Sequence, residues 1–169
     1  YRLARETPRV GLLSIGEEDT KGNSFVLETL PLLRNASHLN FIGNVEGRDV
    51  MSDDVDVCVT DGFTGNVVLK TLEGGMQAVI GALLEAFAQP EYKEHADALM
   101  PALLPLYETL NPDTYGGAVL LGVNGVCIIA HGSSSARAIE NGINVARDLV
   151  EHDMVTEIRD AIAAAAPAD

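Results

Sequence analysis

One pattern recurs along this chain: a short apolar run, then a glycine-rich polar loop, then the start of a helix. The clearest copies span residues 10–23, 55–66 and 125–135. Repeated strand–loop–helix units predict a parallel sheet with helices packed against it. In such a sheet, the loops at the carboxyl ends of the strands gather at one edge, where ligands bind. The pattern therefore predicts both an α/β fold and the location of a site.

Size and charge exclude several classes of function. The 169 residues, 47% of them hydrophobic, fit one globular domain. A formal net charge of −14 disfavours binding to nucleic acid and to anionic lipid headgroups. No dinucleotide fingerprint or phosphate-loop motif follows a strand, which argues against nicotinamide and ATP chemistry. No spacing is typical of a zinc site, so we expect neither a cofactor nor a metal.

The cysteines and the lengths of the apolar runs predict the cellular compartment of the protein. Cys58 and Cys127 both fall in predicted buried strands, which is typical of reduced core thiols in the cytoplasm. No uninterrupted apolar run reaches the roughly 18 residues of a membrane span, and no signal peptide is present. We therefore expect a cytoplasmic protein.

The apolar periodicity predicts alternating strands and helices. Strands are expected at residues 9–15, 39–43, 55–60 and 126–130, and helices at 24–34, 64–88, 92–110, 134–149 and 154–165. Pro31 is expected to interrupt the first helix or mark its last turn. Pro101 and Pro105 predict a kinked or split helix. No internal domain boundary is evident, and residues 77–112 are interpreted as a helical excursion from the α/β core.

Three loops carry groups suited to an oxyanion. Lys21, Gly22 and Asn23 combine a cation, a permissive backbone and a helix start. Thr64, Gly65 and Asn66 open the next predicted helix, with Thr64 as its cap. His131 and Ser133 precede a third helix. Each set also fits an ordinary structural role as a solvated lysine, a helix cap or a loop histidine, and both interpretations stay open.

Other features have two interpretations as well. Arg48 can bind an anion or pair with Glu46 or Asp49, and the acidic run 17–19 is interpreted as a solvated loop. The leucine-rich stretch after the long helix exceeds what a single core requires. It fits a dimer interface, an acyl-chain groove or a membrane-contacting surface.

Seven motifs, taken in order, resemble the phosphate acyltransferase family (PlsX). They are PRVGLLSIG at 8–16, KGN at 21–23, NFIGNVEGRD at 40–49, DGFTGNVVLKT at 61–71, YGGA at 115–118, LLGVNG at 120–125 and HGSS at 131–134. The resemblance implies a Rossmann-like αβα sandwich with a mainly parallel sheet, similar to isocitrate and isopropylmalate dehydrogenases. It also implies that the chain is the carboxyl-terminal half of a longer enzyme, folded as a single α/β domain.

The same resemblance implies transfer of a fatty acyl group from acyl carrier protein to inorganic phosphate. The acyl-phosphate product would serve phospholipid synthesis. The enzyme would be a homodimer associated peripherally with the inner face of the membrane. The catalytic lysine and asparagine of the family would fall on Lys21 and Asn66.

The mechanism we expect is thioester phosphorolysis, in which bound phosphate attacks the thioester carbonyl. Lys21 would hold phosphate or the developing oxyanion, Asn66 would donate an amide hydrogen bond, and the helix start at Gly65 would add N–H groups. His131 and Ser133 are further candidates for phosphate contact, and residues 79–110 would hold the acyl chain. The alternatives are a non-catalytic dimerisation or membrane-docking fragment, or a short-chain phosphotransacetylase. The catalytic hypothesis requires the turns that carry Lys21 and Asn66 to meet at one pocket.

Overall fold

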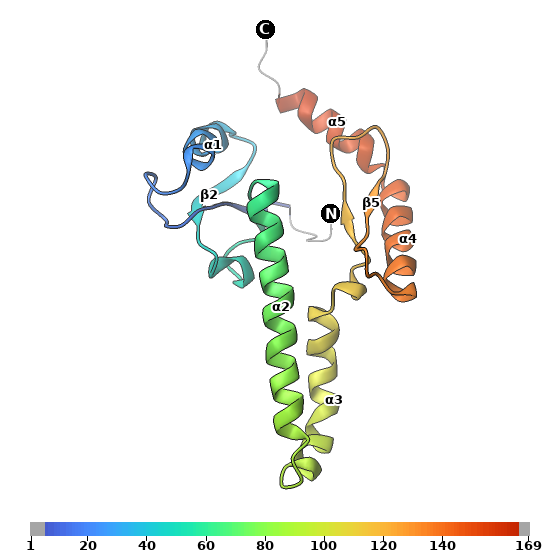
Figure 1. Cartoon of the computed structure of the whole chain (residues 1–169). Helices are drawn as coiled ribbons and strands as arrows, with labels where there is room; N and C mark the ends of the chain where they lie inside the picture. The colour runs from blue at the N-terminus through green and yellow to red at the C-terminus, as the bar shows by residue number, and fades with distance from the viewer. Residues whose placement is uncertain (1–5, 166–169) are drawn as a thin grey trace. The chain divides into compact units, whose positions relative to one another are not determined.

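The chain divides into two compact units, residues 1–72 (unit 1) and residues 73–169 (unit 2). The structure is a computed structural model that describes residues 6–165 (Figure 1). Parallel strands joined by a helix confirm the predicted α/β class. The proposed likeness to the dehydrogenases and the assignment of a single domain stay predictions.

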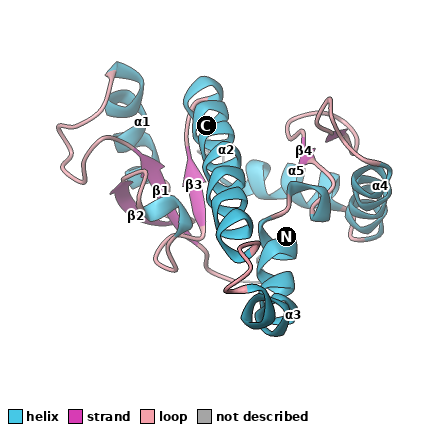
Figure 2. Ribbon diagram, turned by 60° about the horizontal axis from the view of Figure 1, so that its bottom comes forward, coloured by secondary structure: helices cyan, strands magenta, loops and turns pink. Residues whose placement is uncertain are grey.

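Unit 1 is built on a three-stranded parallel sheet. Its strands are β1 (Arg9–Leu13), β2 (Asn40–Val45) and β3 (Val57–Val59), in the order β2-β1-β3 (Figure 2). The central strand β1 is almost wholly apolar, as is usual for a parallel strand with neighbours on both sides. Its register aligns Leu12 with Asn44 of β2 and with Val59 of β3. The carboxyl ends of β1 and β3 therefore lie side by side.

Helix α1 (Ser24–Asn35) connects β1 to β2 and packs against the sheet. Val26 and Leu30, four residues apart and so on one face of the helix, are buried together with Leu12. Pro31 lies inside this helix, which continues beyond it to Asn35. Of the two predicted outcomes, an interruption does not occur, because burial of the apolar face outweighs the one backbone hydrogen bond that a proline removes, and the helix ends about one turn after Pro31.

Helix α2 (Gly62–Phe87) follows β3 and runs from unit 1 into unit 2. It begins two residues before the predicted start. By length and composition alone it could cross a membrane, and no residue of its most apolar 18-residue segment is buried. No such segment was expected from the sequence, because polar residues interrupt the apolar run. A helix that packs against another apolar surface has the same composition.

The 3₁₀ turn η1 (Asp49–Met51) also lies in unit 1, and unit 2 holds the remaining elements. They are α3 (Lys93–Leu110), the 3₁₀ turn η2 (Pro112–Thr114), β4 (Ala118–Val119), β5 (Ile128–Ile129), α4 (Ala136–Glu151) and α5 (Met154–Ala165). Helix α3 lies beside the second half of α2 (Figure 1). It remains one helical element through Pro101 and Pro105, so the predicted split does not occur.

The third strand–loop–helix repeat departs from the predicted parallel sheet. β5 pairs with β4 in an antiparallel hairpin, with Ala118 opposite Ile129 and Val119 opposite Ile128. The short glycine-containing connection between them suits an antiparallel pair, since a parallel pair needs a crossover of a dozen or more residues. Among the described residues, the parallel sheet is therefore limited to β1, β2 and β3.

Cys58 lies in β3 and Cys127 lies just before β5, and both are free and half-buried. Burial raises the pKa of the Cys58 thiol above its ordinary value. This agrees with a protonated, unreactive thiol at that position.

Candidate functional site

A cavity of about 550 Å³ lies in unit 1 at the carboxyl ends of β1 and β3. Its floor is apolar and includes Leu12 and Val59. Most polar or glycine positions in its wall come from the loops after the two strands: Ser14, Gly22, Asn23, Thr60 and Asp61. The others are Thr29 on α1, Gly47 after β2 and Thr64 at the start of α2. This is the edge at which open α/β sheets bind ligands, and the volume is typical of a small-molecule site.

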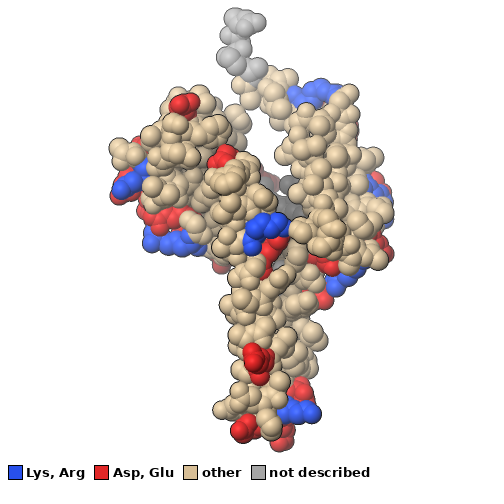
Figure 3. Space-filling model, viewed as in Figure 1, with Lys and Arg blue, Asp and Glu red and all other residues tan. Residues whose placement is uncertain are grey.

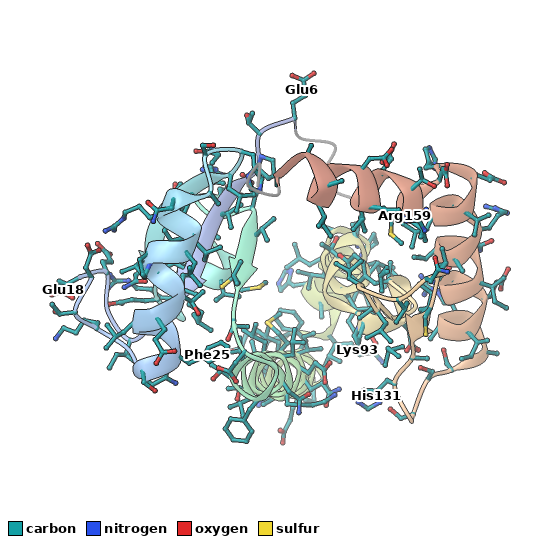
Figure 4. All side chains as sticks on the ribbon, turned by 90° about the horizontal axis from the view of Figure 1, so that it is seen from above. Glu6, Glu18, Phe25, Lys93, His131 and Arg159 are labelled. Carbon is teal, nitrogen blue, oxygen red and sulfur yellow. The ribbon has the colours of Figure 1, made fainter. Side chains whose placement is uncertain are left out.

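The first turn of α1 forms one side of the cavity. Asn23 caps the helix, and its Oδ1 accepts a hydrogen bond from the Val26 N–H at 3.0 Å. The backbone N–H groups of Ser24 and Phe25 come before the first intrahelical hydrogen bond. Among the described residues, the helix therefore offers these two N–H groups no acceptor. Figure 4 shows Phe25 at this end of α1. A neutral cap and two amides without intrahelical partners make this helix start suitable for an anion.

The turn before α1 depends on glycine. Gly22 has a φ of +109°, which side chains rarely adopt. A Cβ at this position would lie 2.7 Å from Val26 Cγ1 and 3.1 Å from the Ser14 hydroxyl. The backbone at Gly22 therefore lies directly over the first turn of α1 and the end of β1.

The first turn of α2 forms the opposite side and is capped differently. The Oδ1 atom of Asp61 accepts hydrogen bonds from the N–H groups of Phe63 and Thr64, both at 2.9 Å. The Asp61 carbonyl accepts from the Gly65 N–H at 2.9 Å. The predicted cap Thr64 is wrong, because Asp61 has that role, and the Gly65 amide expected to meet phosphate is already bonded.

Hydrogen bonds stabilise the negative charge of the Asp61 carboxylate. The side-chain hydrogen bond from Thr64, followed by backbone N–H bonds, lowers the pKa of the Asp61 carboxyl below its ordinary value. This cap therefore places a negative charge in the wall of the cavity at neutral pH. An anion in the cavity is favoured at α1 and disfavoured at α2.

Lys21 is exposed in the loop between β1 and α1. Its backbone N–H donates to the Glu18 carbonyl at 3.0 Å. The acidic residues of the same loop are held by arginines: Glu17 lies 3.1 Å from Arg48, and Asp19 lies 2.7 Å from Arg34. All three acids are exposed, which agrees with the expected solvated loop, and two of them are in exposed ion pairs.

Arg48 forms ion pairs with neighbouring acids, which is one of its two predicted roles. It pairs with Glu46 at 3.2 Å and lies 3.7 Å from Asp49, in addition to its contact with Glu17. On the opposite side of the loop, the hydrogen bonds from Arg34 lower the pKa of Asp19. Two acids of the loop that carries Lys21 are therefore paired with guanidinium groups.

The structure brings the two predicted loops together at one cavity, but neither catalytic candidate lines it: Lys21 and Asn66 are both exposed outside its wall. Gly22, Asn23 and Thr64 line the one cavity. On α2, Thr64 and Val68 face it, four residues apart. Asn66 is exposed and two residues from each, which places it on the other side of the helix. Its catalytic role stays a prediction.

His131 and Ser133 lie in unit 2, in the loop between β5 and α4. Their side chains contact each other, with 2.6 Å between His131 Nδ1 and Ser133 Oγ, and both residues are exposed. Their proposed contact with phosphate stays a prediction. Among residues 6–165, no three His, Cys, Asp or Glu side chains are grouped to hold a metal ion.

Sequence reasoning missed four polar residues of the cavity: Ser14, Thr29, Thr60 and Asp61. Ser14 lines it directly after β1, and its hydroxyl is buried with no hydrogen-bond partner among the described residues. Thr60 occupies the equivalent place after β3, and Asp61 follows it. The signal was present at the end of both strands: a polar residue immediately after an apolar strand lies at the ligand-binding edge.

Unit 2 has an apolar groove between α2 and α3, with a volume of about 300 Å³. Its walls are formed by residues such as Val79, Leu83, Phe87, Leu103 and Leu104. Figure 3 shows few charged side chains along the visible face of these helices. The groove lies within the stretch for which the sequence allowed an acyl-chain groove, an interface or a membrane surface.

The chain is similar to known proteins over most of its length. A family model described as "Fatty acid synthesis protein" matches residues 2–157. A Nostoc phosphate acyltransferase is 43% identical over 160 residues, covering 94% of this chain and 47% of the relative. A phosphate acyltransferase from a Geobacillus species is 47% identical over 156 residues, which cover 92% of this chain and 47% of the relative. One from Pelotomaculum thermopropionicum is 48% identical over 156 residues, which cover 92% of this chain and 45% of the relative. The chain thus spans about half the length of these relatives.

Proposed function

Because this chain belongs to the phosphate acyltransferase family of fatty acid synthesis proteins, we propose that it binds inorganic phosphate in the cavity of unit 1. The reaction is transfer of a fatty acyl group from acyl carrier protein to that phosphate. The observation that carries the proposal is the asymmetric cavity, with a neutral helix start at α1 and a carboxylate cap at α2.

Phosphate needs little chemical activation for this reaction. A phosphate oxygen attacks the thioester carbonyl carbon, the carbon–sulfur bond breaks, and the carrier leaves as a thiolate that takes up a proton. The protein has to hold the nucleophile and stabilise the oxyanion that develops on the carbonyl oxygen. We assign these tasks to the amides of Ser24 and Phe25 and to the Lys21 ammonium. Each of these groups lies at the start of α1 or in the loop before it.

The expected change for Lys21→Ala is a loss of about 100-fold or more in the turnover of acyl-phosphate, since one oxyanion donor contributes that much. The assay uses the whole enzyme that contains this chain, with long-chain acyl carrier protein as donor. Lys70→Ala is the matched control, because Lys70 is another exposed lysine of unit 1. Near-normal turnover in Lys21→Ala would remove Lys21 from the mechanism.

Asn66 is tested in the same assay. An intact rate in Asn66→Ala would agree with its position away from the cavity. A loss as large as that of Lys21→Ala would show that the acyl donor reaches the outer side of α2 and would restore the predicted pair. Replacing the long-chain donor with acetyl-CoA separates this activity from that of a short-chain phosphotransacetylase.

A second candidate function, peripheral docking, is favoured by the exposed apolar helix α2. In that case the α2–α3 groove serves membrane contact or pairing with a second copy, and the protein works at the inner face of the membrane from the cytoplasm. Flotation with liposomes, with and without residues 79–110, tests membrane contact. Retention of flotation after the deletion would exclude these helices as the contact.

A further inference from the structure

We infer that Asn44 is a positioning residue that fixes the turn carrying Lys21, an inference that rests on the proposed phosphate site. Asn44 lies on β2, and only 7% of it is exposed. Its Nδ2 donates to the Glu18 carbonyl at 3.1 Å. The same carbonyl accepts the backbone N–H of Lys21 at 3.0 Å. One buried side chain therefore holds the turn that sets the backbone position of Lys21.

Packing alone does not account for an amide at this position. Among the described residues, the Oδ1 atom of Asn44 is buried with no hydrogen-bond partner. A buried acceptor without a partner lowers stability, whereas an apolar side chain of similar size would avoid that loss. The neighbouring Val45 and the register partner Leu12 are buried apolar residues. The polar side chain at position 44 is thus explained by the contact with the turn.

The other attachments of the loop are exposed. Asp19 binds Arg34 through two hydrogen bonds of 2.7 and 2.8 Å, and Glu17 binds Arg48 at 3.1 Å, with every one of these side chains more than half exposed. Exposed ion pairs contribute little to stability. Figure 4 shows Glu18 in the same loop, beside α1. The buried contact from Asn44 is therefore the main constraint on the turn.

Displacement of this turn would move the ammonium relative to the start of α1. A misplacement of about 1 Å, caused by a residue away from the reacting atoms, can lower a rate by about 100-fold. Because Lys21 is assigned to phosphate, the effect should appear in phosphate binding. The binding of the acyl donor should not change.

The test is Asn44→Leu in the whole enzyme, with Asn40→Leu as the matched control. Asn40 is also on β2, but it is exposed, and its amide donates to the Thr7 carbonyl at 3.4 Å. In Asn44→Leu we expect the KM for phosphate to rise about tenfold and the KM for the acyl donor to stay unchanged. The thermal unfolding temperature should be unchanged or higher. Asn40→Leu should leave both KM values unchanged.

A purely structural role predicts a different pattern. It would lower the folded fraction, and with it kcat, and leave the KM for phosphate unchanged; that result overturns the inference. If Asn44→Leu does not fold, Asn44→Ala removes the same hydrogen bond to the Glu18 carbonyl without adding a larger apolar side chain. A several-fold rise in the KM for phosphate supports positioning of the turn, and an unchanged KM overturns it.

Lys21→Ala measured alongside distinguishes this inference from the proposed function. If the unmodified enzyme makes no acyl-phosphate, the proposed function fails, and if Lys21→Ala leaves the KM for phosphate and the turnover normal, the assignment of Lys21 to phosphate fails. If Lys21→Ala is defective and Asn44→Leu is normal, only the positioning role fails. Hydrogen exchange gives a readout independent of activity: in Asn44→Leu the Lys21 amide should exchange faster, and the Val26 amide, held by Asn23, should not.

Discussion

Two helices open onto the cavity of unit 1, and their first turns differ. Helix α1 is capped by Asn23, a neutral side chain that accepts one amide, from Val26. Helix α2 is capped by Asp61, a carboxylate that accepts the amides of Phe63 and Thr64. A helix start attracts anions only if its own cap does not already supply the negative charge. The cap residue therefore decides which of two similar helix starts can bind phosphate.

The comparison also explains the glycine before α1. The chain turns at Gly22 with a positive φ and passes directly over Val26. At the start of α2, a Cβ on Gly62 would meet no atom within 4 Å. The turn before α1 is therefore more tightly packed than the start of α2, and its backbone conformation tolerates fewer residue types.

The largest expected effect separates these two glycines. Gly22→Ala should lower the free energy of unfolding by about 2 to 3 kcal/mol, because alanine is strained at this φ and its Cβ crowds Val26. Gly62→Ala should change stability by no more than about 0.5 kcal/mol, or raise it, since alanine favours the helix. Urea unfolding of the two variants measures both values. Equal losses would mean that the two turns are equally constrained.

The sequence predicted the α1 side of this comparison well. The apolar run of β1, the glycine of the turn and Asn23 before an amphipathic segment are local signals, and the helix begins within a residue of its predicted start. Local signals could not separate Asp61 from Thr64, because both residue types cap helices and they are three positions apart. Which one caps depends on where the chain leaves β3.

The missed features depend on contacts between distant segments. Which side of α2 faces the cavity depends on how the helix lies against the rest of unit 1, so the sequence did not reveal that Thr64 and Val68 line the cavity and that Asn66 lies on the other side. The pairing of Ile128 and Ile129 with β4 is likewise set by Ala118 and Val119. A two-residue strand has too little pattern of its own to choose a parallel or an antiparallel partner.

A second prediction exchanges the charges of the two caps. Asn23→Asp keeps a good cap but adds a negative charge beside the proposed phosphate, so phosphate binding should weaken by about tenfold. Asp61→Asn removes a charge from the opposite wall and should strengthen binding by a smaller factor. Titration calorimetry with inorganic phosphate measures both, with sulfate as a comparison anion. Unchanged affinity in Asn23→Asp would place the phosphate elsewhere.

The smallest expected effect uses acid to change one cap and not the other. The pKa of Asp61 is lowered in the folded state, first by the Thr64 side chain. Its contribution to stability is therefore complete above the ordinary pKa of an aspartate, about 3.9, and is lost as the pH falls through the lower folded value. Asn23 does not titrate, so the cap of α1 is unaffected.

Backbone NMR through an acid titration compares the two caps within one sample. The amide signals of Phe63 and Thr64 should shift together as Asp61 takes up a proton, while the Val26 amide, bonded to Asn23, should not follow that midpoint. Asp19, whose pKa is lowered by Arg34, titrates nearby, so Asp19→Asn is the control that removes its contribution. If the Val26 amide still shifts with the midpoint of Asp61 in that variant, the two first turns respond as one unit. The different caps would then be insufficient to make α1 alone the anion site.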